Sequence, residues 1–286
     1  MEQIKNEQLT VTVSSMGAEL QSIKNANGKE YLWQADPEVW GRHSPILFPI
    51  VGSLWKGKYR TGGKEYALSR HGFARDHDFK LIAQGPERLT YALESTDETL
   101  KVYPYRFTLS VTYRLRGNRL SVIWHVHNED TCEMYFAIGA HPAFNLPCGH
   151  CEGRLKFDNE DDQLERGFCT ADGCLPKRTA PMETRDGILS FDESTFTDDA
   201  LIIDGCQVHK VSLLDDEGRP YVSVDFRAPA VGLWSPAGKN APFVCIEPWY
   251  GVTDKEGFDG ELRDKYLMNH LQPGASFMSE YGITIE

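Results

Sequence analysis

The chain has 286 residues, of which 41% are hydrophobic and 25% are charged, a composition typical of a folded globular protein. Its formal net charge of −12 argues against a nucleic-acid binder and against binding to anionic membranes, because both need a basic surface. No window approaches the roughly 20 apolar residues of a membrane span. The N-terminus also lacks the apolar run of a secretion signal, so we expect a cytoplasmic protein.

Hydrophobicity with a period of two dominates the chain. In chain order it predicts a hairpin at 58–68, a helix of one or two turns at 97–104, hairpins at 106–126 and 207–226, and a closing strand at 276–286. The region 146–200 is rich in Asp, Glu, Gly and Pro, and we expect long loops with short strands there. The pattern therefore predicts an all-β sandwich with few short helices, folded as a single domain over 1–286.

Three short stretches place polar residues where the strand pattern expects apolar ones. They are RHGFARDHDF (70–79), FAIGAHPAFNLP (136–147) and PFVCIEPWYG (242–251). His141 lies in an apolar strand and is followed by Pro142, so we expect the strand to end or bulge there and aim His141 into a cleft. Glu247 ends an apolar, β-branched run and also precedes a proline.

These residue types suit acid/base chemistry. Burial of a carboxylate at a strand end raises its pKa, which suits Glu247 as a general base. An imidazole with a pKa near neutrality suits His141 as the partner acid. The neighbouring aromatic residues Phe144, Trp249 and Tyr250 could form a flat apolar floor for a sugar ring. The alternative for His141 is a hydrogen-bonded histidine of the core, and the alternative for Glu247 is a structural ion pair.

Two groups of residues raise the alternative of a metal site. His125 and His127 lie on one face of a predicted strand, where solvent-facing or pocket-wall histidines are the other interpretation. A set of four cysteines has spacing close to that of a zinc ribbon: Cys148, Cys151, Cys169 and Cys174. Because the seven cysteines are an odd number in an expected cytosolic chain, we expect mostly reduced thiols.

Taken together, the three stretches resemble the aldose 1-epimerase (galactose mutarotase-like) superfamily. SRHGFARDHDF, IGAHPAFNLP and CIEPWYG match its motifs in that order, and GRHSPILFPIVG (41–52) resembles the segment that precedes them. The resemblance covers nearly the whole chain. The motif HGFAR resembles the form of this motif in one branch of the superfamily, which contains LacX-like proteins and glucose-6-phosphate 1-epimerases.

The resemblance implies a large, twisted antiparallel β-sandwich that holds a sugar in a cleft across one sheet. It implies that His141 is the general acid and Glu247 the general base. It also implies a set of residues that hold the sugar oxygens, namely Arg42, His71, Arg75 and Asp199, with Asp198 as an alternative register for the last. Arg70 is expected to be a solvated neighbour of this set.

The implied activity is mutarotation of an aldohexose of the galactose or glucose type, without a metal or redox cofactor. A 6-phosphorylated hexose would be the substrate if Arg42 and Arg75 together clamp a phosphate. The expected partner is a small sugar or sugar phosphate, and the expected state a monomer or homodimer. Alternatives are a non-catalytic sugar-binding or sugar-sensing protein, and glycoside hydrolysis by Asp199 and Glu247, against which the histidine in the acid position argues.

Overall fold

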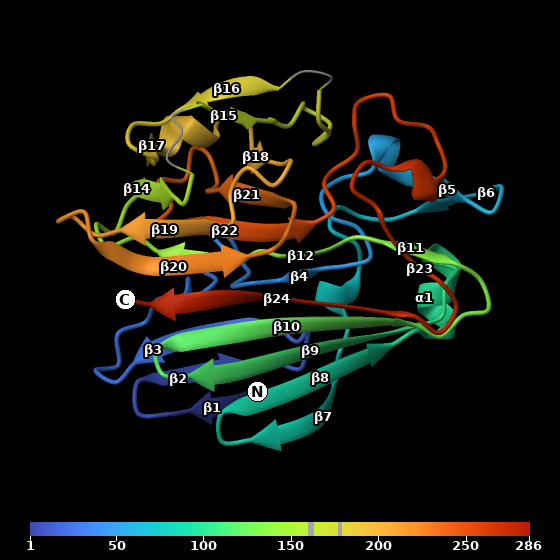
Figure 1. Ribbon diagram of the computed structural model, residues 1–286, viewed down its shortest axis with the longest axis horizontal. Coiled ribbons are helices and arrows are strands. Elements are labelled where there is room, and N and C mark those ends of the chain that lie inside the picture. The colour runs from blue at the N-terminus through green and yellow to red at the C-terminus, as the bar shows by residue number, and fades with distance from the viewer. Residues whose placement is uncertain (160–162, 177–178) are drawn as a thin grey trace.

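The computed structural model describes residues 1–159, 163–176 and 179–286, and its fold is all-β with antiparallel strand pairing, as the alternation predicts (Figure 1). The largest sheet has nine strands, in the order β17 (Ile188–Asp192), β14 (Glu152–Phe157), β19 (Lys210–Leu214), β20 (Pro220–Phe226), β24 (Ser276–Ile285), β10 (Arg119–Asn128), β9 (Phe107–Arg116), β8 (Arg88–Glu94) and β7 (Lys80–Gly85). In Figure 1 the strands from β24 to β7 follow one another down the lower half of the molecule.

A second sheet of six strands carries the residues of most interest. Its order is β18 (Leu201–Ile203), β21 (Ala230–Trp234), β22 (Phe243–Tyr250), β12 (Ile138–Ala140) and β4 (Ile46–Leu47), and β13 (Ala143–Asn145) also pairs with β22. The central strand β22 therefore has neighbours on both edges, so its backbone position is fixed from two sides.

Smaller elements complete the fold. The short sheets are β1 (Glu2–Lys5), β2 (Leu9–Val13) and β3 (Leu20–Asn25); β5 (Lys58–Thr61) and β6 (Lys64–Ala67); β11 (Met134–Phe136) and β23 (Asn269–Leu271); and β15 (Gln163–Arg166) and β16 (Ala180–Glu183). The helices are α1 (Asp97–Val102) and the 3-10 turns η1 (Trp55–Gly57), η2 (Ala74–Asp76), η3 (Glu193–Phe196) and η4 (Leu262–Asp264). No helix in the described part of the chain is long and apolar enough to cross a membrane.

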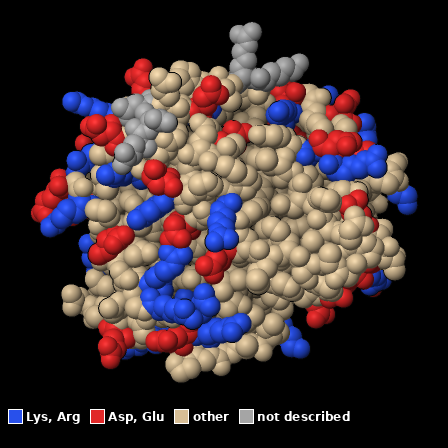
Figure 2. Space-filling model, viewed as in Figure 1, with Lys and Arg blue, Asp and Glu red and all other residues tan. Residues whose placement is uncertain are grey.

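The three predicted hairpins are confirmed as β5–β6, β9–β10 and β19–β20, and the predicted closing strand as β24. The predicted helix is α1, which Thr96 caps by accepting a hydrogen bond from the Thr99 N–H. Short strands and loops occupy the described residues of 146–200, as expected from their composition. On the face drawn in Figure 2, Lys and Arg side chains are interleaved with Asp and Glu side chains.

Strand β22 is buried on both faces, and its alternate side chains pack into different apolar clusters. Val244 and Ile246 pack into the main core, which also receives the inward side chains of the nine-stranded sheet. Cys245 and Trp249 point to the opposite face and join two smaller apolar clusters. Glu247 lies between them on this second face, so a strand that reads as a continuous apolar run delivers one carboxyl group to a buried position.

Candidate active site

A small cavity opens on the second face of β22. It has a volume of about 170 Å³ and is lined by Trp40, Arg70, His71, Arg75, His141, Asp199, Ala200, Trp234, Glu247 and Trp249. A larger hollow of about 750 Å³ lies beside β14 and β17, but it is lined by exposed side chains such as Glu152 and Asp216. Convergent buried ionisable groups mark the smaller cavity as the candidate site.

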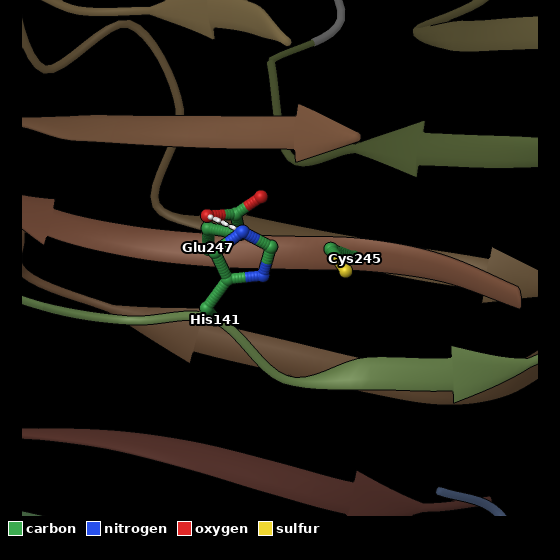
Figure 3. A group of neighbouring side chains, drawn as sticks. All are labelled: His141, Cys245 and Glu247. Atoms are coloured by element: carbon green, nitrogen blue, oxygen red, sulfur yellow. Dashed lines mark ion pairs between the residues drawn. The ribbon is translucent and has the colours of Figure 1, made fainter. Parts of the chain in front are cut away.

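The structure brings His141 and Glu247 together, as the sequence motifs suggest. Strand β12 ends at Ala140, and His141 and Pro142 form the link to β13, so the strand does end where the proline predicts. His141 Nε2 lies 3.3 Å from Glu247 Oε2, and the two side chains are only 10% and 1% exposed (Figure 3). The pair is therefore close enough to exchange a proton directly or through a bound hydroxyl group.

Burial shifts the proton affinities of the pair in opposite directions. Loss of solvation raises the pKa of Glu247 well above its ordinary value; Arg70 opposes this shift and Asp199 adds to it. Loss of solvation, together with the charge of Arg70, lowers the pKa of His141 to about 3. The expectation of an imidazole titrating near neutrality is therefore wrong in this structure, because a buried ring beside arginines resists protonation.

His71 enters the cavity from an unusual backbone conformation. Its φ is +69°, and the next residue, Gly72, also has a positive φ. A Cβ at Gly72 would lie 2.3 Å from the Phe48 carbonyl oxygen, so only glycine fits there. The Gly52 N–H donates to His71 Nδ1 at 3.1 Å, and in the neutral ring the proton must then be on Nε2. Burial lowers the pKa of His71, so this residue is a neutral donor.

The arginines form a linked group, but with different partners from those expected. Arg70 is exposed, as expected of a solvated neighbour, but it also lines the cavity and forms an ion pair with Asp199 at 2.7 Å, which was not expected. The Arg75 guanidinium donates to the Arg70 carbonyl oxygen at 2.7 Å. Arg42 is not among the cavity-lining residues and instead pairs with Asp76 at 2.6 Å. Burial lowers the pKa of Arg75, and the nearby charge of Arg42 lowers it further.

Asp199 lines the cavity in the register favoured by the sequence, and Asp198 does not. Asp199 has a φ of +67°, in the left-handed region that residues other than glycine seldom adopt. Two cavity residues, His71 and Asp199, therefore hold sparsely populated backbone conformations. Such conformations concentrate at functional sites, where the surrounding structure enforces them.

Three tryptophans form the apolar walls of the cavity, and of these only Trp249 was expected. Trp249 lines the cavity, but Phe144 and Tyr250 pack against the main core on the other face of the sheet. Trp40 and Trp234 take their place. The sequence signals for these two are positional: Trp40 directly precedes the family-like stretch 41–52, and Trp234 closes an apolar strand.

The four cysteines with zinc-ribbon spacing do not gather into one site. Among the described residues, the only three side chains whose metal-binding atoms all lie within 4.8 Å of one another are His141, Cys245 and Glu247 (Figure 3). His125 and His127 stack on each other with ring centroids 6.4 Å apart, and His127 Nδ1 bonds to the Ser276 hydroxyl.

Comparison with known proteins agrees with the geometry. A model of the family described as aldose 1-epimerase matches residues 2–260. The chromosomal protein LacX of Lactococcus lactis subsp. lactis is 35% identical over 299 residues, which cover 99% of this chain and 98% of the relative.

Two solved structures are also very similar. A galactose mutarotase related enzyme from Lactobacillus acidophilus superposes with a TM-score of 0.94 at 40% identity, covering 100% of this chain and 97% of that one. A galactose mutarotase-like protein from Lactobacillus casei ATCC 334 does so with a TM-score of 0.94 at 31% identity, covering 100% of both chains. These matches confirm the resemblance and the fold: the chain belongs to the aldose 1-epimerase family.

Proposed function

We propose that this protein interconverts the α and β anomers of an aldohexose of the galactose or glucose type by acid/base opening of the sugar ring. The observation that carries the proposal is the buried His141–Glu247 pair, 3.3 Å apart, at the wall of a cavity that also presents fixed polar groups. The names of the relatives support a sugar as ligand, since two of the structural neighbours are described as related to galactose mutarotase.

The reaction needs two proton transfers and one bond cleavage. Glu247 takes the proton from the C1 hydroxyl group, the C1–O5 bond breaks, and His141 protonates the ring oxygen O5 to give the open-chain aldehyde. Rotation about C1–C2 presents the other face of the aldehyde, and the same two residues run the steps in reverse. Each positioned proton transfer is worth roughly 10²–10⁴-fold in rate. The balance of atoms and charge requires no external oxidant or reductant.

The opposite pKa shifts are consistent with this scheme because the pair holds one proton in either form. A protonated Glu247 beside a neutral His141 has the same proton count as a Glu247 carboxylate beside a His141 imidazolium. Burial favours the first form, whereas the proposed reaction starts from the second. The site must therefore contain groups that stabilise an ionised Glu247, and Arg70 is one of them.

The cavity walls suit a single pyranose ring. A volume of about 170 Å³ is below the roughly 300–1,000 Å³ typical of pockets for drug-sized ligands. The His71 Nε2–H and the Arg70–Asp199 pair offer donors and acceptors for ring hydroxyl groups, and the tryptophan faces suit the apolar C–H faces of a sugar. Arg75 can reach the same ligand, and Arg42 contributes from the rim through its charge.

The direct test is exchange spectroscopy by NMR, or polarimetry, on freshly dissolved α-galactose and α-glucose and on their 6-phosphates. We expect anomer exchange well above the buffer rate for at least one of these sugars. If every sugar in the panel equilibrates at the buffer rate while calorimetry still shows binding, the protein is a sugar-binding or sugar-sensing member of the family.

A further inference from the structure

The indole of Trp249 spans the sheet between two glycines on the neighbouring strands. Trp249 faces Gly139 of β12 in the register of the sheet, and Gly232 of β21 faces Glu247. A Cβ at Gly139 would lie 2.6 Å from Trp249 Cδ1, and a Cβ at Gly232 would lie 2.7 Å from Cζ2. The five-membered edge of the ring therefore covers β12, and the six-membered edge covers β21.

Both positions require glycine because of the space that the indole occupies and not because of their backbone conformation. Neither Gly139 nor Gly232 has a positive φ, so an L-residue could adopt either backbone conformation. Glycine weakens the interior of a strand, and in that position it often marks the close approach of another group. Here the approaching group is the indole of Trp249, since any side chain at either position would collide with it.

We call Gly139 and Gly232, which leave room for the indole, the glycine seat of Trp249. This seat fixes the orientation of the indole ring and of its N–H group. Trp249 is only 3% exposed, and its Nε1 atom is buried without a regular hydrogen-bond partner. Glu247 Oε2 is also buried without a hydrogen bond of regular geometry, although His141 Nε2 lies 3.3 Å from it. Glu247 and Trp249 are two residues apart on the same face of β22 and line the same cavity, and the indole N–H opposes the rise that burial causes in the pKa of Glu247. A buried hydrogen-bond donor without an acceptor is unfavourable. The presence of an unpartnered donor close to an unpartnered carboxyl oxygen therefore requires an explanation.

We propose that Trp249 is a positioning residue that donates its indole N–H to Glu247 when the carboxylate forms, and that Gly139 and Gly232 make room for the ring that carries this donor. The inference rests on the proposed function, in which Glu247 must ionise in order to act as the base. A hydrogen bond to an ionised group is stronger than one to its neutral form, so the donor acts where the reaction needs it.

Other charged or titratable groups also face Glu247 and could set its ionisation: His141, Arg70, Asp199, Cys169 and Cys245. Arg70 is the one that favours the carboxylate, but its charge is shared with Asp199 at 2.7 Å. Asp199 itself disfavours the carboxylate. The neutral N–H of Trp249 therefore adds stabilisation without a second countercharge.

The test is the titration of Glu247, followed by NMR of ¹³C-labelled glutamate side chains, with Glu247→Gln to assign the signal. Trp249→Phe removes the N–H and keeps a ring in the seat. We expect the Glu247 midpoint to rise by about one pH unit, the tenfold change that loss of one hydrogen bond to a charged group produces. The acid limb of kcat/KM should move by the same amount. An unchanged midpoint overturns the proposal.

Gly232→Ala provides a second route to the same effect, because the new Cβ must displace the indole. It should raise the midpoint in the same direction. Two matched controls should leave it unchanged. Trp124→Phe removes another buried, unpartnered indole N–H, on the main-core side of the molecule. Gly153→Ala places a Cβ 2.7 Å from the Phe191 ring in β17, away from the cavity.

A further measurement tests the proposal without a substitution at Trp249. In the wild-type protein the ¹H–¹⁵N resonance of the Trp249 indole should shift with pH along the Glu247 titration, and in Glu247→Gln that shift should vanish. A pH-independent indole resonance in the wild type contradicts the proposal. Both titrations proceed without substrate, so a protein that exchanges no anomers would refute the proposed function and still answer the question about Trp249.

Discussion

The indole of Trp40 stacks on the imidazole of His141, with ring centroids 5.0 Å apart and an interplanar angle of 27°. Trp234 meets the same imidazole edge-on, with centroids 5.5 Å apart. The loop that carries Trp40 is held by a hydrogen bond from Trp33 Nε1 to the Trp40 carbonyl oxygen. The two tryptophans therefore fix the plane of the imidazole and exclude water from it.

Replacing Trp40 by leucine should expose the imidazole to water. Because burial is the largest cause of the lowered pKa of His141, we expect that pKa to rise by about one to two units in Trp40→Leu, with kcat falling more than KM changes. Trp40→Phe should retain most of the stack and of the activity. Histidine NMR titration and steady-state kinetics measure the two effects. Trp55→Leu, a half-buried tryptophan outside the cavity lining, should change neither.

Removing either member of the acid/base pair should affect turnover more than binding. We expect Glu247→Gln and His141→Asn each to lower kcat by at least about 10²-fold, since each removes a proton transfer and leaves the cavity walls intact. Kinetics combined with sugar binding by calorimetry separates the two effects. If binding disappeared while turnover per bound sugar stayed normal, the proposed roles of the two residues would be wrong.

Period-two hydrophobicity was sufficient to predict the hairpins and the fold class, because alternation along a strand depends only on which face is buried. The unusual residues His141 and Glu247 pointed to the cavity for the same reason. The tryptophan walls could not be predicted in this way. Phe144 and Tyr250 are near the motif in sequence, yet strand register turns them to the main core, whereas Trp40 reaches the cavity from a distant loop.

The partner of Asp199 shows a second limit of sequence reasoning. Arg70 and Arg75 are five positions apart and flank the same apolar triplet, so sequence alone gives no reason to prefer one of them as the partner of Asp199. In the structure His71 and Gly72, which lie between the two arginines, have left-handed conformations, and it is Arg70 that pairs with Asp199. Tertiary contacts hold this segment in place, such as the hydrogen bond from the Phe73 N–H to the Phe48 carbonyl oxygen, and such contacts have no local sequence signature.

The raised pKa of Glu247 should appear in the pH dependence of stability. Its native pKa lies well above the ordinary value of 4.5, so between pH 4.5 and that native pKa the native state holds a proton that the unfolded chain releases. Stability should therefore fall as pH rises, by at most about 1.4 kcal/mol per pH unit for one group. His141, with its lowered pKa, contributes a slope of opposite sign near and below pH 7 in both the wild type and Glu247→Gln, so the difference between the two proteins reports Glu247.

Chemical denaturation of the wild type and of Glu247→Gln between pH 5.5 and pH 9, a range that begins just above the ordinary carboxyl pKa, measures this effect. We expect the variant to lose less stability with rising pH than the wild type does. Glu65→Gln is the control, since this exposed carboxyl group has a lowered pKa and is ionised in both states over the range. Parallel pH slopes for the wild type and Glu247→Gln would contradict the raised pKa.

A hexose 6-phosphate should be a better substrate than the free hexose. Arg42 and Arg70 each have a close carboxylate partner, whereas Arg75 lies 3.8 Å from an Asp76 that Arg42 already engages. Arg75 Nε is buried without a hydrogen bond, so this guanidinium can donate hydrogen bonds to a phosphate group at the cavity wall. We expect kcat/KM for galactose 6-phosphate to exceed that for galactose by at least about tenfold.

Arg75→Ala should abolish that preference by lowering kcat/KM much more for the phosphorylated sugar than for the free one. Arg60→Ala, which changes an exposed arginine on β5, should alter neither substrate. The phosphate hypothesis fails if the wild type treats the two sugars alike. It also fails if Arg75→Ala harms both equally, because an arginine dedicated to phosphate matters only when phosphate is present.

The glycine seat beneath Trp249 ties three positions on three strands into one evolutionary unit. A mutation to alanine at Gly139 or Gly232 is harmful only while the large ring is present, and loss of the ring leaves a gap that small side chains at both glycines could then fill. Drift at any one position is therefore constrained by the other two. Across the family these positions should covary, with two glycines accompanying a tryptophan and bulkier neighbours accompanying a smaller residue in its place.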